Sequence, residues 1–390
     1  EAVYRAVLRI APRHPDALHL LGVLLRQTGR VQAAVASLRR AAAIAPQAAV
    51  IHYNLGSALL DAGRLEEAAE SFHQALRLED GLIEAYINLG AVYRLQGKLD
   101  DSLAMLQRAC AQDPDRVECW LNLGQTLRAA GQAEDAERCL RRGLELVPTH
   151  VPTLEELGAL LIEQGRPAEA CTSLDAALRC VPNRPAAWNH KAMALRAMDR
   201  LDEALACGRR ACELAPHSFE ILANLAGLYD SAGQLAEAVA CYQQALKQRP
   251  RAPEVLANLG FALARLGQYA EALACYDQAL DIWPDYPLAH ANRAMTLLQL
   301  GRYREGWEEY EWRWKCQHSA LPRARLTAPL WQGEPLDNKT LLVHGEQGLG
   351  DEIMFATCYP DVIAAAKEIG RGLLFALAAN IIARRPVSDR

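Results

Sequence analysis

The 390-residue sequence contains few aromatic residues, no strong excess of either charge and no apolar run long enough to cross a membrane. The longest apolar run near its end, Leu373 to Ala383, is only about half of the ~20 residues that a membrane-spanning helix needs. The net charge of −5 comes from 42 basic and 47 acidic residues that are interspersed along the chain. This balance excludes the concentrated basic surface of a nucleic-acid-binding protein. We therefore expect neither a membrane nor a nucleic acid as partner.

The eleven cysteines lack the spacing of metal or disulfide sites. Neither C-x-x-C nor a Cys/His pair at zinc spacing occurs, so we predict no metal site and no cofactor. Four cysteines occupy equivalent positions of a repeating pattern in which other copies carry serine, and we interpret them as small packing residues: Cys139, Cys207, Cys241 and Cys275. An odd total without a disulfide framework favours a reducing compartment, and we expect a cytoplasmic protein.

Small residues recur at an interval of 34 residues along most of the chain. One series contains only Gly or Ala: Gly22, Gly56, Gly90, Gly124, Gly158, Ala192, Ala226, Gly260 and Ala294. A second series is Gly at every step but one: Gly29, Gly63, Gly97, Gly131, Gly165, Asp199, Gly233, Gly267 and Gly301. Such regularity is typical of a stack of small, similar units and not of a single globular core.

Residues 117–150 illustrate the unit. Apolar and small residues first fall at i, i+3, i+4 and i+7, on one face of a helix: Trp120, Leu123, Gly124 and Leu127. Gly131 ends this helix, and a second helix repeats the spacing with Ala136, Leu140, Gly143 and Leu144. Pro148 closes the unit, where proline stops one helix and prepares the entry to the next.

The unit resembles the tetratricopeptide repeat. The family's pattern of Trp, Leu-Gly, Tyr, Ala, Phe and Pro corresponds here to Trp120, Leu123-Gly124, Leu127, Ala136, Leu140 and Pro148. The resemblance implies an all-α, right-handed superhelical solenoid of helix-turn-helix repeats. We count nine repeats over residues 15–316, including a capping helix at their carboxyl end. Residues 1–14 resemble the second helix of a further, partial repeat, so we expect the true amino terminus upstream.

The unit at 185–218 departs most from the pattern. Lys191 replaces the leucine of the first helix, Asp199 replaces the glycine of the turn, and Gly208 replaces a large side chain of the second helix.

One polar position also follows the repeat. Six units carry asparagine two residues before the small residue of the first helix: Asn54, Asn88, Asn122, Asn224, Asn258 and Asn292. In tetratricopeptide folds this position faces a concave groove, and the series resembles the asparagine ladder of O-linked N-acetylglucosamine transferases. An amide offers both a donor and an acceptor, which suits an extended peptide in the groove. Alternatively, each asparagine bonds a neighbouring helix.

Charged residues accompany the asparagines on the same helices. The inward candidates are Glu84, Glu118, Glu220, Glu254, Arg26, Arg94, Arg128 and Arg196. They form either a mixed-charge lining of the groove or an ordinary solvated surface.

The pattern changes after Gly301. An aromatic-rich helix that includes Trp307 and Tyr310 is predicted to cap the array, because the last apolar face of a repeat stack must be covered. Residues 317–338 have the composition of a linker. A strand is predicted at 340–344 and a second at 373–377, so that residues 339–390 form a small, partial α/β (Rossmann-like) segment.

Between these strands lies a glycine-rich turn with a helix predicted to begin near Asp351. Gly348 and Gly350 permit a tight backbone there, and the helix amino terminus can receive a phosphate or another anion. The stretch resembles bacterial tetratricopeptide proteins that carry a glycosyltransferase-like (GT-B type) domain of the heptosyltransferase family. That resemblance implies Asp351 as a catalytic general base; alternatively, Asp351 only caps the helix.

Two functions therefore remain after the sequence is read. The first is a protein-interaction scaffold that binds an extended polypeptide in the concave groove and can self-associate through its repeat ends. The second is a glycosyltransferase-related protein whose repeats present protein acceptors. Because the resemblance stops before a nucleotide-sugar domain, we expect a truncated segment and no enzymatic activity from this chain as it stands.

Overall fold

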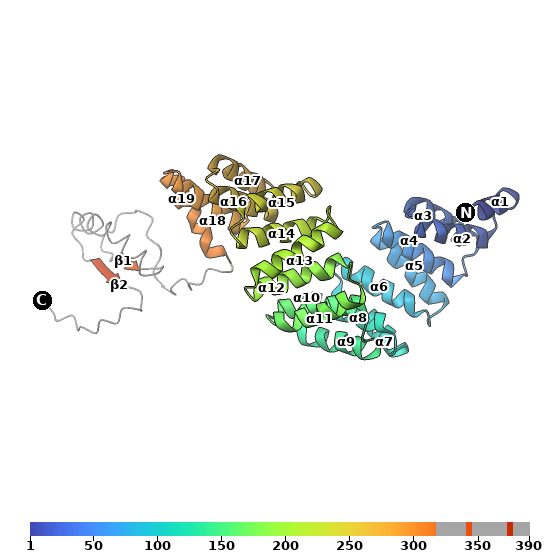
Figure 1. Ribbon diagram of the computed structural model, residues 1–390. Coiled ribbons are helices and arrows are strands. Elements are labelled where there is room, and N and C mark those ends of the chain that lie inside the picture. The colour runs from blue at the N-terminus through green and yellow to red at the C-terminus, as the bar shows by residue number, and fades with distance from the viewer. Residues whose placement is uncertain (317–340, 345–372, 377–390) are drawn as a thin grey trace. The chain divides into compact units, whose positions relative to one another are not determined.

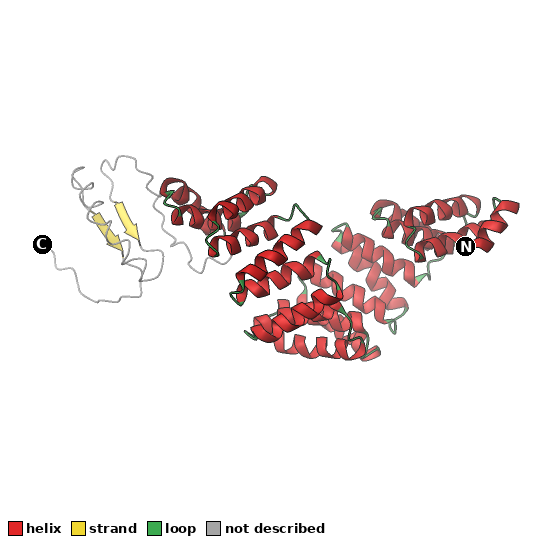
Figure 2. Cartoon of the chain, turned by 45° about the horizontal axis from the view of Figure 1, so that its top comes forward, coloured by secondary structure: helices red, strands yellow, loops and turns green. Residues whose placement is uncertain are grey.

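The computed structural model describes residues 1–316, 341–344 and 373–376 (Figure 1). By its internal contacts the chain divides into two units, Glu1–Pro250 and Arg251–Arg390, which are considered separately below. Residues 1–316 are almost entirely helical, and short loops join successive helices (Figure 2).

The helices of the first unit form an initial single helix and then a series of hairpins. They are α1 (Ala2–Ile10), α2 (Pro15–Gln27), α3 (Val31–Ile44), α4 (Ala49–Asp61), α5 (Leu65–Leu78), α6 (Ile83–Leu95), α7 (Leu99–Gln112), α8 (Val117–Ala129), α9 (Ala133–Leu146), α10 (Val151–Glu163), α11 (Pro167–Cys180), α12 (Pro185–Ala197), α13 (Leu201–Leu214), α14 (Phe219–Ser231) and α15 (Leu235–Gln248).

The second unit continues the same alternation and then adds two short strands. Its elements are α16 (Pro253–Arg265), α17 (Tyr269–Ile282), α18 (Pro287–Gln299), α19 (Tyr303–Tyr310), the 3₁₀ helix η1 (Glu311–Lys315), β1 (Leu341–His344) and β2 (Leu373–Ala376). The prediction of helical hairpins with a 34-residue period is thus confirmed.

Glycine sets the turn inside each hairpin. Gly131, for example, has a φ of 75°, a left-handed conformation that side chains with a Cβ adopt at a cost. The equivalent glycines all share this conformation. Asp199 takes it up as well, with a φ of 59°, in the hairpin of α12 and α13. The second glycine series therefore exists because the chain reverses direction there through a left-handed residue.

The first glycine series sets how closely the two helices of a hairpin approach. A Cβ atom on Gly124 of α8 would lie 2.8 Å from Leu140 of α9, and Leu140 is fully buried. The hairpin of α12 and α13 lacks this large-against-small contact, because Gly208 stands where Leu140 stands in its own hairpin. A Cβ on Gly208 would instead meet Leu225 and Leu228 of α14 at 3.1 and 2.9 Å. Side chains of the next hairpin therefore occupy the space beside Gly208 that a large side chain of α13 would otherwise fill.

Within the first unit each second helix packs against the first helix of the next hairpin, and successive first helices also touch, as α8 and α10 do. Buried leucine, alanine and aromatic side chains form the core between them, including Tyr86, Phe72 and Leu161. A helical hairpin alone would leave this apolar surface in water, so each hairpin depends on its neighbours for stability.

In the second unit, α19 and η1 pack against α18, as expected of a capping segment. The ring of Trp312 in η1 stacks on His290 of α18 with centroids 4.0 Å apart. The strands β1 and β2 pair in parallel, with Leu341 opposite Leu373. They lie where the sequence predicts strands, whereas the linker 317–338 and the predicted helix at Asp351 lie outside the described residues. A partial α/β segment therefore stays a prediction.

Candidate peptide-binding surface

The six asparagines of the repeating series are each the sixth residue of a first helix, on α4, α6, α8, α14, α16 and α18. Asn258 is exposed, and the other five are half-buried. They are therefore placed in equivalent positions, although they do not make equivalent contacts.

Three of the asparagines donate to the preceding first helix. Asn54 Nδ2 lies 2.8 Å from His19 Nε2, Asn88 Nδ2 lies 3.4 Å from the Tyr53 hydroxyl, and Asn224 Nδ2 lies 3.2 Å from Asn189 Oδ1. Each partner is 35 residues earlier in the chain. These bonds hold successive first helices together and are worth about 1 kcal/mol each.

Asn122 and Asn258 are used differently. Asn122 Nδ2 donates 2.9 Å to the carbonyl of Glu118 on its own helix. No hydrogen bond from the Asn258 side chain occurs within the described residues. Helix-to-helix bonding thus accounts for Asn54, Asn88 and Asn224, while Asn122 and Asn258 have no such role.

Glu156 and His190 occupy the same position of the repeat in α10 and α12. Around Glu156 a row of polar side chains crosses three successive first helices. Arg94 Nη2 donates 3.2 Å to Gln125 Oε1, and Gln125 Nε2 donates 3.2 Å to Glu156 Oε2. Arg128 Nε lies 3.0 Å from Glu156 Oε1. We call Arg94, Gln125, Arg128 and Glu156 the polar row.

Burial shifts the pKa of two groups at this surface. Burial lowers the pKa of Arg94, although the charge of Glu156 opposes that shift. Burial also lowers the pKa of His190, against the charges of Glu155 and Glu156. The buried Nδ1 atom of His190 has no hydrogen-bond partner among the described residues. His190 is therefore a neutral imidazole at neutral pH.

Several of the expected inward charges form ion pairs, though not with one another. Arg116 lies 2.8 Å from Glu84 and 3.6 Å from Glu118, and Arg26 lies 2.6 Å from Asp61. These pairs are largely exposed, so each adds little to stability.

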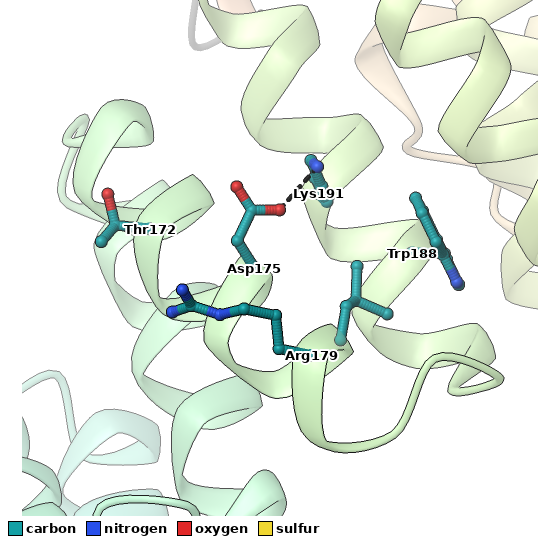
Figure 3. Close-up of a pocket in the computed structure, with 6 residues that line it drawn as sticks. Thr172, Asp175, Arg179, Trp188 and Lys191 are labelled. Carbon is teal, nitrogen blue, oxygen red and sulfur yellow. Dashed lines mark hydrogen bonds and ion pairs between the residues drawn. The ribbon is translucent and has the colours of Figure 1, made fainter.

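A separate pocket of about 560 Å³ lies between α11 and α12 (Figure 3). Lys191 reaches from α12 towards Asp175 on α11, and their Nζ and Oδ1 atoms are 2.6 Å apart. Burial acts to lower the pKa of Lys191, but the hydrogen bond and charge of Asp175 outweigh it, so the pKa is raised. The lining is completed by Thr172, Leu178, Arg179 and Trp188. Lys191 lines this pocket at the position where seven other first helices carry leucine.

The remaining predicted site residues, Gly348, Gly350 and Asp351, lie outside the described residues. Within residues 1–316 and the two strands, no three His, Cys, Asp or Glu side chains gather as a metal would require. None of the helices described there has the length and apolar character needed to span a bilayer.

Sequence reasoning missed the partners that connect one repeat to the next. The sequence pattern does not identify His19 or Gln125 as contact residues, nor Asp175 as the partner of Lys191. The sequence does separate the partners of these contacts by fixed intervals. The interval is 35 residues for Asn54 and His19, 31 for Gln125 and Glu156, and 16 for Lys191 and Asp175. Such intervals become meaningful only once the stacking of the hairpins is known.

Comparisons with known proteins agree with this arrangement. One tetratricopeptide repeat model matches residues 1–49, 224–287 and 258–311, and a second matches residues 47–115 and 183–251. The middle tetratricopeptide-like domain of cilia and flagella-associated protein 70 matches residues 106–215. Together the two repeat models cover more than half of the chain.

Among curated proteins, FlbA of Caulobacter vibrioides is 45% identical over 60 residues, which is 15% of this chain and only 10% of FlbA. A tetratricopeptide repeat protein of Parabacteroides merdae has a similar crystal structure, with a TM-score of 0.52 and 19% identity over 64% of this chain and 98% of that one.

The structure of the APC/C hetero-tetramer Cut9-Hcn1 is similar with a TM-score of 0.58 and 16% identity over 72% of this chain and 55% of that one. Because these sequence identities are below 20%, the two structures show only that the fold is similar. The hairpin period, the turn glycines and the repeat models agree, and the chain belongs to the tetratricopeptide repeat family.

Proposed function

We propose that this chain is a protein-interaction scaffold that binds an extended polypeptide along its first helices, in the concave groove of the repeats. The observation that carries the proposal is the polar row, which joins the first helices α6, α8 and α10 and places Glu156 at the position of the repeat that asparagine occupies on six other first helices. One of the structures of similar fold is named as a hetero-tetramer, Cut9-Hcn1, which supports an assembly role for such repeats.

The chemistry of the first helices fits a peptide backbone. In the described residues, no hydrogen bond reaches the side-chain oxygens of Asn54, Asn88 and Asn224, whose amide nitrogens hold the helices together. These oxygens can accept bonds from peptide N–H groups. Asn258 can present both the N–H and the C=O of its amide to a peptide. Asn122 can do the same once its Nδ2 no longer donates to the Glu118 carbonyl. Because each such bond is worth only about 1 kcal/mol, affinity requires several in register.

The test separates binding from folding. Asn122→Ala and Asn258→Ala remove amides that hold no neighbouring helix, whereas changing all six asparagines also removes the bonds between helices. We expect the double variant to keep the parent's helicity and melting temperature but to bind fewer members of an immobilised array of extended peptides. The six-fold variant should bind still fewer.

The matched control is Gln107→Ala with Gln243→Ala, two exposed amides on the second helices α7 and α15. This control should bind the array as the parent does. Equal loss in both double variants, or no loss in the asparagine variant, would refute binding along the first helices.

A glycosyltransferase-related role is the alternative. The parallel pairing of β1 and β2 favours it, because parallel strands open an α/β domain. We expect no transfer from a panel of nucleotide-sugars. Sustained turnover that disappears in Asp351→Asn would reverse the ranking of the two functions.

A further inference from the structure

Two first helices carry a cation where the other seven carry leucine. The seventh residue of each first helix is Leu21, Leu55, Leu89, Leu123, Leu157, Lys191, Leu225, Leu259 or Arg293. The leucines pack between hairpins, so a charged side chain at this position is placed in surroundings that are otherwise apolar.

Each cation is paired with an aspartate 16 residues earlier, on the preceding second helix. Lys191 Nζ lies 2.6 Å from Asp175 Oδ1 of α11, and Arg293 Nη1 lies 2.5 Å from Asp277 Oδ1 of α17. Pockets of about 560 and 310 Å³ lie beside these two pairs, and Figure 3 draws the first. The two pairs therefore occupy equivalent positions of the 34-residue repeat.

The aspartates occur only where a cation follows. At the same position before the seven leucines stand Arg5, Arg39, His73, Gln107, Arg141, Arg209 and Gln243. No other hairpin offers an acid there. In two places along the chain, therefore, a cation replaces the leucine of a first helix and an aspartate appears opposite it on the preceding second helix.

Burial of the two cations exceeds that of their aspartate partners, which costs stability. The side chains of Lys191 and Arg293 are only 22% and 26% exposed, whereas those of Asp175 and Asp277 are 50% and 60% exposed. Placing a cation where leucine would pack removes it from water, and the half-exposed Asp175 returns only part of that loss for Lys191. Arg293 has a second, more buried partner, because its Nε donates 2.7 Å to Glu309 Oε2 and the Glu309 side chain is 15% exposed. The stability argument therefore rests on Lys191, where we expect a leucine to fill the junction better.

We propose that the Asp175–Lys191 and Asp277–Arg293 pairs are specificity determinants that fix which hairpin stacks on which. Because the hairpins are similar, a hairpin can stack on the wrong neighbour. The stack can skip a hairpin, or it can include a hairpin of a second copy of the chain. If α12 packed on α9 in place of α11, Lys191 would face Arg141. Lys191 would then face a second cation, one that is already paired with Glu137 of its own helix, and would lack its aspartate, so the wrong stack would be disfavoured.

The test compares stability with the accuracy of refolding in the full chain under reducing conditions. Lys191→Leu restores the residue of the other hairpins. We expect its melting temperature to rise by about 2–4 °C, a shift that follows a small gain in stability for a unit of this size. We also expect the fraction of dimer and protease-sensitive monomer after refolding at high concentration to at least double, as measured by light scattering and limited proteolysis.

A variant in which the two charges of the pair are swapped gives the decisive test. In Asp175→Lys with Lys191→Asp the correct junction is again neutral, but the new acid would also pair with Arg141 of α9. We expect near-parental melting with more misassembly. A transplanted pair, Arg141→Asp with Leu157→Lys, should fold, whereas Leu157→Lys alone should be strongly destabilised by the unchanged Arg141.

Three results would overturn the proposal. Lys191→Leu could refold as accurately as the parent, or melt at a lower temperature, in which case the pair serves stability. The exchanged pair could refold without additional misassembly, in which case discrimination against Arg141 has no part in stacking.

Discussion

Gly56 of α4 lies directly against the ring of Phe72 of α5, so that a Cβ atom on Gly56 would lie 2.8 Å from the Cδ1 and Cε1 atoms of that ring. Phe72 is fully buried, so it has no free space into which to move. The absence of one side chain therefore sets the spacing of the two helices.

Gly56→Ala should destabilise the first unit by about 1–3 kcal/mol, because the methyl group overpacks the hairpin. The loss should occur even though alanine favours a helix by up to about 1 kcal/mol over glycine. Chemical denaturation followed by circular dichroism measures it.

The control is Gly227→Ala in α14, where the nearest atom to a new Cβ is the flexible Arg196 Nη1 at 3.4 Å. This variant should gain about 0.5–1 kcal/mol from helix propensity. If both alanines shifted stability equally, contact with Phe72 would not be the cause.

Asp199→Gly should stabilise the hairpin of α12 and α13 by about 1 kcal/mol, because Asp199 has a left-handed φ of 59° that glycine adopts without strain. Hydrogen exchange of the α12 and α13 amides should slow in the variant. The reverse change, Gly165→Asp, places a side chain at a φ of 72° with open space around it. It should speed exchange in α10 and α11, and an unchanged rate would contradict the role of backbone strain.

The sequence alone predicts the hairpins well, because turn glycines and close-packed glycines are local requirements that recur every 34 residues. It also identifies 185–218 as the divergent unit from Lys191, Asp199 and Gly208. It does not predict that Leu225 and Leu228 take the space beside Gly208, because that contact comes from another hairpin. The two uses of the asparagines likewise depend on what the preceding helix offers: histidine before Asn54 and tyrosine before Asn88.

Arg184→Ala should lower stability by about 1–2 kcal/mol, because it leaves the carboxylate of Glu155 without its partner. Glu155 is only 9% exposed and receives three hydrogen bonds of 2.9, 3.1 and 3.0 Å from the Nε and Nη2 atoms of the guanidinium. The expected loss is smaller than for a fully buried ion pair, because the Arg184 side chain is 45% exposed to solvent.

Arg184→Lys should recover only part of the loss, since an ammonium group cannot form the same two-pronged contact. Arg200→Ala, which breaks an exposed pair with Glu203 on the same face of one helix turn, is the matched control and should change little. Thermal unfolding of the three variants at equal ionic strength provides the comparison.

The stability of the first unit should fall as the pH drops below about 6.5, the ordinary pKa of histidine, and His190 should contribute to this fall. Burial lowers the pKa of His190, so the unfolded chain binds a proton at a higher pH than the folded one. The contribution is fully present above pH 6.5 and is lost as the pH falls towards the lower pKa of the folded state. His19, His73 and His150 have pKa values that burial lowers in the same way, so they add to the effect.

His190→Gln should therefore make the decline in melting temperature between pH 7 and pH 5 shallower without removing it. His217→Gln, at an exposed position before α14, should leave the parental profile unchanged. The acids around His190, namely Glu155, Glu156 and Glu220, act in the opposite direction to its burial. If they prevailed, the His190→Gln profile would be steeper than that of the parent, and a profile parallel to the parent would mean that His190 does not take up its proton on unfolding.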